Sequence, residues 1–198
     1  MLERARSLGL PQLAITTMQQ TIVVLGRGSK PAVELELDNC LADSVPLMRR
    51  RGGGCAVVLD PGNVVVSVAL STSGFGRNRE WMTHLCNWLT GGLVAVGVEG
   101  VEMAGISDLA IDDRKVSGAC IHRSRDLLYF SATLLVDPDV QAMERYLSHP
   151  PREPDYRRGR SHADFCGRIS APGISDARAL AAALKRRLAT PPLPAELC

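Results

Sequence analysis

The stretch Arg49-Arg50-Arg51-Gly52-Gly53-Gly54-Cys55-Ala56-Val57-Val58-Leu59-Asp60-Pro61-Gly62-Asn63 decides how the middle of the chain folds. Three glycines follow three arginines. The tetrapeptide Asp60-Pro61-Gly62-Asn63 is a strong turn signal between two runs rich in β-branched residues, 55–59 and 63–70. With a short strand at 46–50, the stretch predicts a strand, a glycine loop and then a β-hairpin.

Outward from this stretch, short apolar runs predict strands and longer amphipathic runs predict helices. Strands are expected at 21–26, 101–105, 109–111, 115–122 and 127–136, and helices at 32–43, 78–90, 139–147 and 176–188. Strands dominate the middle of the chain, so the predicted fold class is α+β, with a mixed, mostly antiparallel sheet and flanking helices. A dinucleotide-binding fold is excluded because Gly26-Arg27-Gly28 lacks the third glycine and no convincing helix follows it.

Length and composition narrow the class of protein further. A chain of 198 residues is expected to form one domain over 1–198. A net charge of +2 and an aromatic fraction of 4% argue against a nucleic-acid partner. The longest charge-free stretch, 81–98, contains polar residues and several glycines, so we expect no membrane span. No signal peptide is recognisable, and a cytoplasmic location is expected. The six cysteines are irregularly spaced, which predicts free thiols and no metal site.

The glycine loop has the composition of an anion site. Glycine backbones approach a ligand closely and expose their amides, and the three preceding arginines add positive charge. That combination suits a phosphate or a carboxylate. A flexible connection with solvated arginines explains the same residues equally well. A Walker loop is excluded because no Gly-Lys-Ser/Thr follows.

Lys115 is one of only three lysines among 23 lysines and arginines. It begins a predicted strand after the turn at Asp112-Asp113 and lies two residues before Ser117-Gly118. An ammonium near small residues can polarise a carbonyl or neutralise a phosphate as a point charge. The alternative is an ordinary solvated lysine in a turn.

Together these motifs resemble those of a known family. The stretch 49–63 resembles the Arg-Arg-x-Ser-Gly-Gly-Gly-Ala-Val-x-x-Asp-x-Gly-Asn signature of lipoate–protein ligases. The segments Ser107-Asp108-Leu109, 115–118 and 133–135 are similar to that family's Asn-Asp-Ile, Lys-Ile-Ser-Gly and Gly-Thr-Leu-Leu stretches, in the same order. The resemblance covers about residues 20–165. It identifies the chain as a suspected member of the biotin/lipoate ligase and octanoyltransferase superfamily.

The resemblance implies both a reaction and a set of site residues. In this family an acyl group is activated as an acyl-adenylate and passed to a lysine of a lipoyl domain. Lys115 matches the catalytic lysine and would bridge the acyl carbonyl and the phosphate. Arg50 matches a phosphate contact. The remaining matched positions would line the acyl and nucleotide pocket: Gly53, Gly54, Cys55, Ala56, Val57, Val58, Asp108, Ser117, Gly118 and Thr133.

The sequence also departs from the family pattern. Taken without gaps, Cys55 replaces the third glycine, Leu59 stands where the ligases often have histidine, and Ser131-Ala132 replace His-Gly. Matching glycine triplet to triplet instead shifts the loop assignments by one residue. We also expect a short N-terminal strand and helix and no accessory C-terminal domain, so a separate accessory ligase domain becomes a candidate partner.

Three functions follow from this comparison. The favoured one is a ligase-type transferase that uses lipoate with ATP and Mg²⁺, or preformed lipoyl-AMP. Its acceptors would be lipoyl domains of the 2-oxoacid dehydrogenase E2 or glycine-cleavage H-protein type. The second is an ATP-independent octanoyl or lipoyl transferase, which needs a thioester-forming cysteine. Such a cysteine is expected near His149, where none occurs, and Cys166 lies too far along the chain. The third is a non-catalytic binder of lipoyl domains or acyl ligands.

Overall fold

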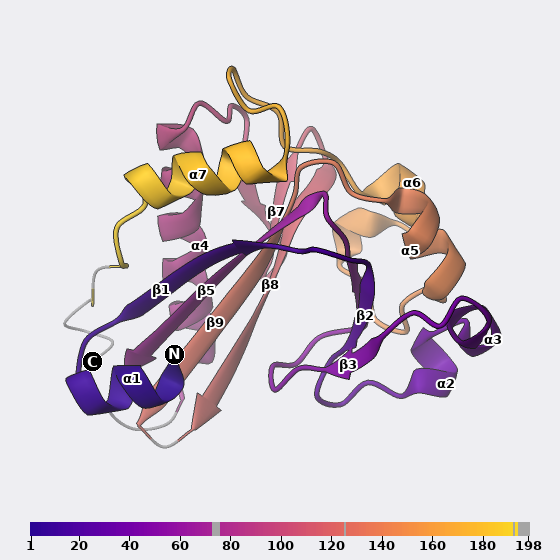
Figure 1. The fold of residues 1–198 in the computed structure, drawn as a ribbon, viewed down its shortest axis with the longest axis horizontal. Helices are drawn as coiled ribbons and strands as arrows, with labels where there is room; N and C mark the ends of the chain where they lie inside the picture. Colours follow the sequence, from indigo (N-terminus) through magenta and orange to yellow (C-terminus); the bar gives the residue numbers. More distant parts are fainter. Residues whose placement is uncertain (73–75, 125, 192, 194–198) are drawn as a thin grey trace.

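The computed structural model describes residues 1–72, 76–124, 126–191 and 193 as a two-sheet α+β fold (Figure 1). The strands of the large sheet, in spatial order, are β1 (Gln12–Thr17), β5 (Asn63–Ser71), β9 (Leu127–Leu135), β8 (Arg114–Ser124), β7 (Asp108–Ile111) and β6 (Glu102–Ala104). All of its pairings are antiparallel. The small sheet has the order β3 (Leu47–Arg49), β2 (Ile22–Leu25) and β4 (Val57–Leu59), with β2 and β3 parallel. The predicted fold class is therefore confirmed.

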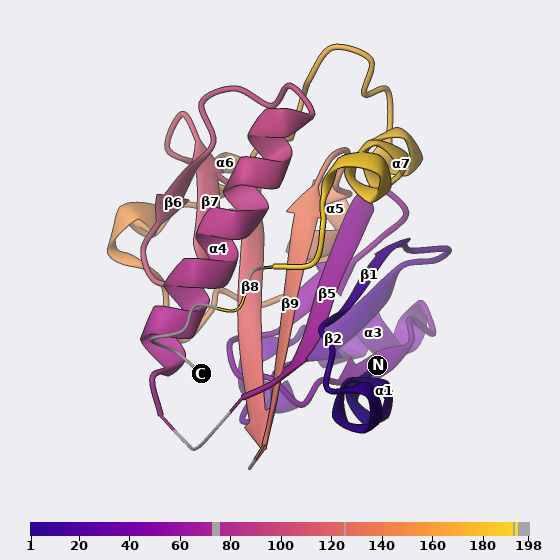
Figure 2. The same ribbon diagram turned by 90° about the vertical axis from the view of Figure 1, so that its left-hand side faces the viewer.

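Two helices cover one face of the large sheet, α4 (Asn78–Ala95) and α7 (Ala177–Arg187), as Figure 2 shows. Their apolar sides meet alternate residues of the central strands, so that Trp81 of α4 and Phe130 of β9 are both fully buried. α7 begins at Asp176, whose carboxylate accepts a hydrogen bond of 2.8 Å from the Ala179 amide. The main core thus lies between these helices and the sheet.

The other helices of the described residues do not lie over this face of the large sheet (Figure 1). They are α1 (Leu2–Leu8), α2 (Pro31–Glu34), α3 (Leu37–Ala42), α5 (Val140–Tyr146) and α6 (His162–Phe165), with a short 3₁₀ helix at Asp155–Arg157. α3, α5 and α6 join the small sheet around a second core cluster that includes Val23 and Phe165. α1 packs beside the end of β5 and β9 through Ala5. Among the described residues, no helix has both the length and the apolar composition needed to cross a bilayer.

The predicted hairpin after the glycine loop is wrong. β4 pairs with β2 in the small sheet, whereas β5 pairs with β1 and β9 in the large one. The turn itself forms as predicted: the Asp60 carboxylate accepts hydrogen bonds from the Gly62 amide at 2.7 Å, the Asn63 side chain at 3.0 Å and the Asp139 amide at 3.2 Å. The turn therefore carries the chain from one sheet to the other.

Two further predictions about elements need correction, and one helix and one strand were not predicted from the apolar pattern. The helix expected at 32–43 is two short helices, because Leu35 leaves the helix to form a bridge with Leu147. α4 does not end at Gly91-Gly92; a Cβ on Gly92 would lie 2.3 Å from Leu188 Cδ1, so this glycine permits close packing within the helix. Residues 2–17 form α1 and β1, neither of which was assigned.

Candidate active site

Lys115 lies near the start of β8, held by a carboxylate and a phenol. Its Nζ is 2.9 Å from Asp108 Oδ1, and the Lys115 side chain is 27% exposed. The other oxygen of Asp108 accepts a hydrogen bond of 2.9 Å from the Tyr156 hydroxyl. Burial and the Asp108 carboxylate raise the pKa of Tyr156 above its ordinary value, so the phenol stays protonated and donates. The ammonium is thus fixed in position but still reaches solvent.

A β-bulge determines which side of the sheet Lys115 faces. Leu109 pairs with Ser117 and Ala110 with Lys115, which leaves Val116 as the extra residue on β8. Val116 lies in the core under α4. The extra residue turns Lys115 to the face of Gly118, where a Cβ would lie only 2.9 Å from the Lys115 Nζ. Gly118 therefore provides the space that the ammonium occupies.

Arg50 fixes the shape of the glycine loop. Its guanidinium donates hydrogen bonds to three main-chain carbonyls: those of Val24 at 3.1 Å, Gly53 at 2.8 Å and Cys55 at 2.7 Å. Gly54 adopts a φ of 93°, a backbone region that favours glycine. The loop is therefore held by hydrogen bonds from the half-buried Arg50 and is not a flexible connection with a solvated arginine.

The glycine loop lies against the large sheet and against the neighbouring turn. A Cβ on Gly52 would lie 2.6 Å from Cys120 Sγ on β8, and a Cβ on Gly26 would lie 1.9 Å from the Gly54 carbonyl oxygen. The carboxylate of Glu34, 6% exposed, accepts hydrogen bonds from the Ala56 amide at 2.6 Å and from the Ser29 hydroxyl at 2.8 Å. These contacts place the loop amides over the same face of the sheet as Lys115.

Residues 2–171 match the family model of the lipoyl protein ligase A/B catalytic domain. The chain belongs to this family. The chain is 31% identical over 129 residues to "Lipoate-protein ligase A" of Psychrobacter cryohalolentis, a match covering 65% of the chain and 36% of that protein. It is 33% identical over 126 residues to "Lipoate--protein ligase" of Streptococcus pyogenes, covering 63% of the chain and 36% of that protein. The chain thus matches about a third of the length of these curated relatives.

Solved structures share the fold of this chain. A bi-partite lipoate protein ligase of Thermoplasma acidophilum, studied with its E2 lipoyl domain, superposes with a TM-score of 0.74 at 21% identity, covering 89% of this chain and 69% of that one. Lipoate-protein ligase A bound with ATP gives a TM-score of 0.66 at 20% identity, covering 89% and 70%. At these identities the likeness establishes the fold alone.

The other predicted site residues divide between the Lys115 face and the core. Thr133 pairs with Gly118 and lies, half-buried, on the Lys115 face. Ser117 pairs with Leu134 of the core under α4, and its Oγ is buried without a hydrogen-bond partner among the described residues. Val58 is 3% exposed and belongs to the second core cluster. For Ser117 and Val58, only the backbone is available to a ligand.

The predicted site residues of the glycine loop, 53–57, remain partly accessible. Ala56 and Val57 are half-buried, and the Cys55 thiol donates a hydrogen bond of 3.6 Å to the Arg152 carbonyl. Gly53 and Gly54 are exposed. The accessible part of the predicted pocket is therefore its glycine end.

Two residues beside Lys115 were not found from the sequence. Tyr156 lies in a segment that reads as an irregular loop, where nothing signals a contact with Asp108. Cys166 was set aside on spacing, yet it forms a parallel bridge with Lys115, and the Gly167 amide donates to the Lys115 carbonyl at 2.8 Å. Burial raises the pKa of the Cys166 thiol, and the positive charge of Lys115 opposes that rise. Only the fold brings these groups together.

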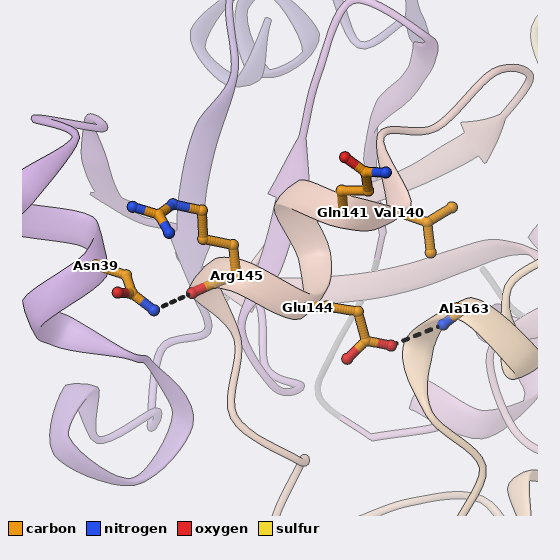
Figure 3. A pocket seen from close by; sticks show the side chains of 6 residues that line it. All are labelled: Asn39, Val140, Gln141, Glu144, Arg145 and Ala163. Atoms are coloured by element: carbon orange, nitrogen blue, oxygen red, sulfur yellow. Dashed lines mark hydrogen bonds between the residues drawn. The ribbon is translucent and has the colours of Figure 1, made fainter.

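Two cavities of about 390 Å³ each lie near α5. The first, shown in Figure 3, is lined by Asn39, Val140, Gln141, Glu144, Arg145 and Ala163. Its polar groups bond to one another: Asn39 donates to the Arg145 carbonyl at 2.9 Å, and Glu144 accepts from the Ala163 amide at 2.9 Å. None of the sequence-predicted site residues lines it. The second cavity lies at the start of β8 and includes Cys166 in its wall.

Proposed function

We propose that this domain is a lipoate–protein ligase-type acyltransferase, which attaches a lipoyl or octanoyl group to a lysine of an acceptor protein. The observation that carries the proposal is the Lys115 ammonium, which lies over Gly118 at 2.9 Å from Asp108 Oδ1. It places a point charge on a partly open sheet face beside a loop of exposed amides. Relatives named lipoate–protein ligase, and related structures with lipoic acid or ATP, support lipoate and ATP as substrates.

The proposed reaction has two steps. The acyl carboxylate attacks the α-phosphate of ATP, which is bound with Mg²⁺, so that pyrophosphate leaves and acyl-adenylate forms. The amine of the acceptor lysine then attacks the acyl carbonyl: the amide C–N bond forms, the C–O bond to the phosphate breaks, AMP leaves and the amine loses a proton. Negative charge develops on the carbonyl oxygen and on the leaving phosphate. The Lys115 ammonium stabilises both as a single donor point.

The surrounding residues have supporting roles in this proposal. Asp108 and Tyr156 keep the ammonium in place over Gly118, so little reorganisation is needed at the moment of reaction. Arg50 is assigned as a positioning residue for the glycine loop, because its donors already serve main-chain carbonyls. The exposed amides at Gly53 and Gly54 are then the groups that receive the carboxylate or phosphate.

Acceptors and partners follow from the same assignment. A lipoyl domain of the E2 or H-protein type is the proposed acceptor, and the archaeal relative studied with its E2 lipoyl domain supports this class. The same relative is described as bi-partite, which supports a separate accessory domain as a partner.

The position of Cys166 favours a second candidate function. In an ATP-independent transferase its thiolate would attack an acyl thioester of a carrier protein, forming the enzyme thioester and releasing the carrier thiol. The acceptor lysine amine would then attack this thioester, form the amide and release the Cys166 thiol. Burial raises the pKa of the Cys166 thiol, and the positive charge of Lys115 offsets only part of that rise, so the substrate would have to bind before the thiolate forms.

Mass spectrometry of an apo lipoyl domain incubated with this protein tests both candidates. The donors are lipoate with ATP, lipoyl-AMP alone and octanoyl carrier protein alone, each with wild type and with Cys166→Ala. The ligase-type function predicts modification from lipoyl-AMP that survives Cys166→Ala. The second candidate predicts modification from octanoyl carrier protein that Cys166→Ala abolishes. Binding of acyl-adenylate with no modification from any donor would instead identify a non-catalytic binder.

A further inference from the structure

The face of the large sheet that carries Lys115 presents three rows of side chains, here called the three-row face. Its residues alternate with Leu128, Phe130 and Leu134, which belong to the core under α4, so they face the opposite side. Across β5, β9 and β8, the rows are Val65-Thr133-Gly118, Ser67-Ser131-Cys120 and Ala69-Tyr129-His122. The glycine loop approaches the three-row face at Cys120, and α1 packs at the far end of this face beside Ala69 and Tyr129.

The far half of the three-row face carries hydroxyl groups that are hydrogen-bonded in series. The Tyr129 hydroxyl donates to Ser67 Oγ at 2.9 Å, and Ser67 Oγ lies 3.4 Å from Ser131 Oγ. Ser67 is 7% exposed, whereas Tyr129 and Ser131 are half-buried. Three hydroxyls carry three hydrogens, and the two bonds between them use two. One O–H hydrogen in the series is therefore left for an acceptor outside it, whichever serine donates in the second bond.

The length of an acyl chain matches this arrangement. Successive rows are two residues apart, so the second and third rows lie roughly 7 Å and 13 Å from the Gly118 row over which Lys115 sits. An eight-carbon acyl chain extends roughly 9 Å from its carboxyl carbon, since its C–C bonds of about 1.5 Å zigzag. With its carbonyl at Lys115, such a chain ends between the second and third rows, against the three hydroxyls.

We propose that Ser67, Tyr129 and Ser131 are the specificity-determining residues of this site. They favour a donor with a hydrogen-bond acceptor at its distal end, such as the dithiolane sulfurs of a lipoyl group, over a saturated chain. A hydrocarbon end placed there would leave the remaining O–H hydrogen without a partner, which is a costly arrangement for a buried donor. A sulfur accepts that hydrogen weakly, and an oxygen accepts it well. This inference rests on the proposed function, because it takes Lys115 as the anchor of the acyl carbonyl.

The test compares ligands that differ only in this acceptor. Cyclopentylpentanoyl-adenylate is the carbocyclic analogue of lipoyl-adenylate, with the same ring size and no sulfur. Dissociation constants are measured by calorimetry with non-hydrolysable sulfamoyl forms of both. KM and kcat are measured with the two acyl-AMP donors. The protein variants are the triple variant Ser67→Ala/Tyr129→Phe/Ser131→Ala and the control Ser124→Ala, which removes a hydroxyl from β8 beyond the reach of the chain.

Wild type is expected to bind the lipoyl analogue about tenfold more tightly than the carbocycle, the ratio typical of one buried unpaired donor. In the triple variant this ratio falls below about threefold through tighter binding of the carbocycle. Ser124→Ala keeps the wild-type ratio. Equal binding of both ligands by wild type, or an unchanged ratio in the triple variant, overturns the inference. A preserved preference without any transfer overturns the proposed function alone, whereas failure to bind either ligand overturns both.

Discussion

Replacing Lys115 by arginine keeps its positive charge but removes the geometry on which the proposed reaction depends. The Nζ fits between Asp108 Oδ1, at 2.9 Å, and the bare Cα of Gly118. A guanidinium is planar, larger and suited to bidentate pairing with a carboxylate. In this position it would pair with both oxygens of Asp108, displace the Tyr156 hydroxyl and turn away from the acyl carbonyl.

The expected loss is that of one preorganised donor to a developing oxyanion, about 3–4 kcal/mol of barrier or at least a hundredfold in kcat. The free energy of unfolding should change by about 1 kcal/mol or less, because partly exposed ion pairs contribute little. The assay is single-turnover transfer from lipoyl-AMP to an apo lipoyl domain, followed by mass spectrometry, with thermal unfolding of the same samples.

Two matched substitutions control for the change of residue type. Lys30 and Lys185 are both exposed, one before α2 and the other in the last turn of α7. Lys30→Arg and Lys185→Arg should keep full activity. If Lys115→Arg also transfers at the wild-type rate, Lys115 is a solvated turn lysine and the reasoning about the site fails.

Three other substitutions test the structure around the site and beyond it. Gly118→Ala places a Cβ 2.9 Å from the Lys115 Nζ and should lower kcat at least tenfold while the fold is retained. Transfer rates and circular dichroism measure the two effects. An unchanged rate would mean that the Lys115 ammonium does not act from this position. Gly26→Ala places a Cβ 1.9 Å from a carbonyl oxygen of the glycine loop and should cost about 1–3 kcal/mol in urea unfolding, unless the loop moves away freely. Hydrogen bonds from Arg145 lower the pKa of Asp43 to about 2, so this carboxylate stabilises the fold above its ordinary pKa near 4 and loses that effect as the pH falls toward 2. In Asp43→Asn, the free energy of unfolding should fall less steeply with decreasing pH in this window than in wild type, as denaturant unfolding at several pH values will show. An identical slope in both proteins would rule out the Asp43–Arg145 ion pair as the source of the loss.

Local signals in the sequence were sufficient to predict the positions of most strands and helices. The strands around 21–26, 115–122 and 127–136 and the helix starting at 78 form close to where the runs of apolar residues place them. A strand or helix needs only the right period of apolar residues and a suitable cap or turn, both of which lie within a few residues. The Lys115 motif and the glycine loop were visible for the same reason.

Errors arose where a local signal has two physical explanations. The turn at 60–63 was correct, but a turn does not specify which strands pair beyond it, and β4 and β5 went to different sheets. Glycines end many helices in other proteins. Here α4 continues past Gly91 and Gly92, and the lack of a Cβ at Gly92 permits the close contact with Leu188. Arg50 stays predicted as a phosphate contact, and what the sequence did not indicate is that its guanidinium also donates to the loop's own carbonyls.

The sequence by itself determined the family and the fold class, and it indicated Lys115 as the proposed catalytic residue. The tertiary structure alone decided what surrounds that lysine. The bulge at Val116 sets its direction, Tyr156 and Cys166 arrive from a distant segment, and the hydroxyls of Ser67 and Ser131 meet across two strands. Contacts between residues far apart in the chain depend on strand register and packing, which are settled by the burial of whole surfaces at once and leave no mark on any short stretch of sequence.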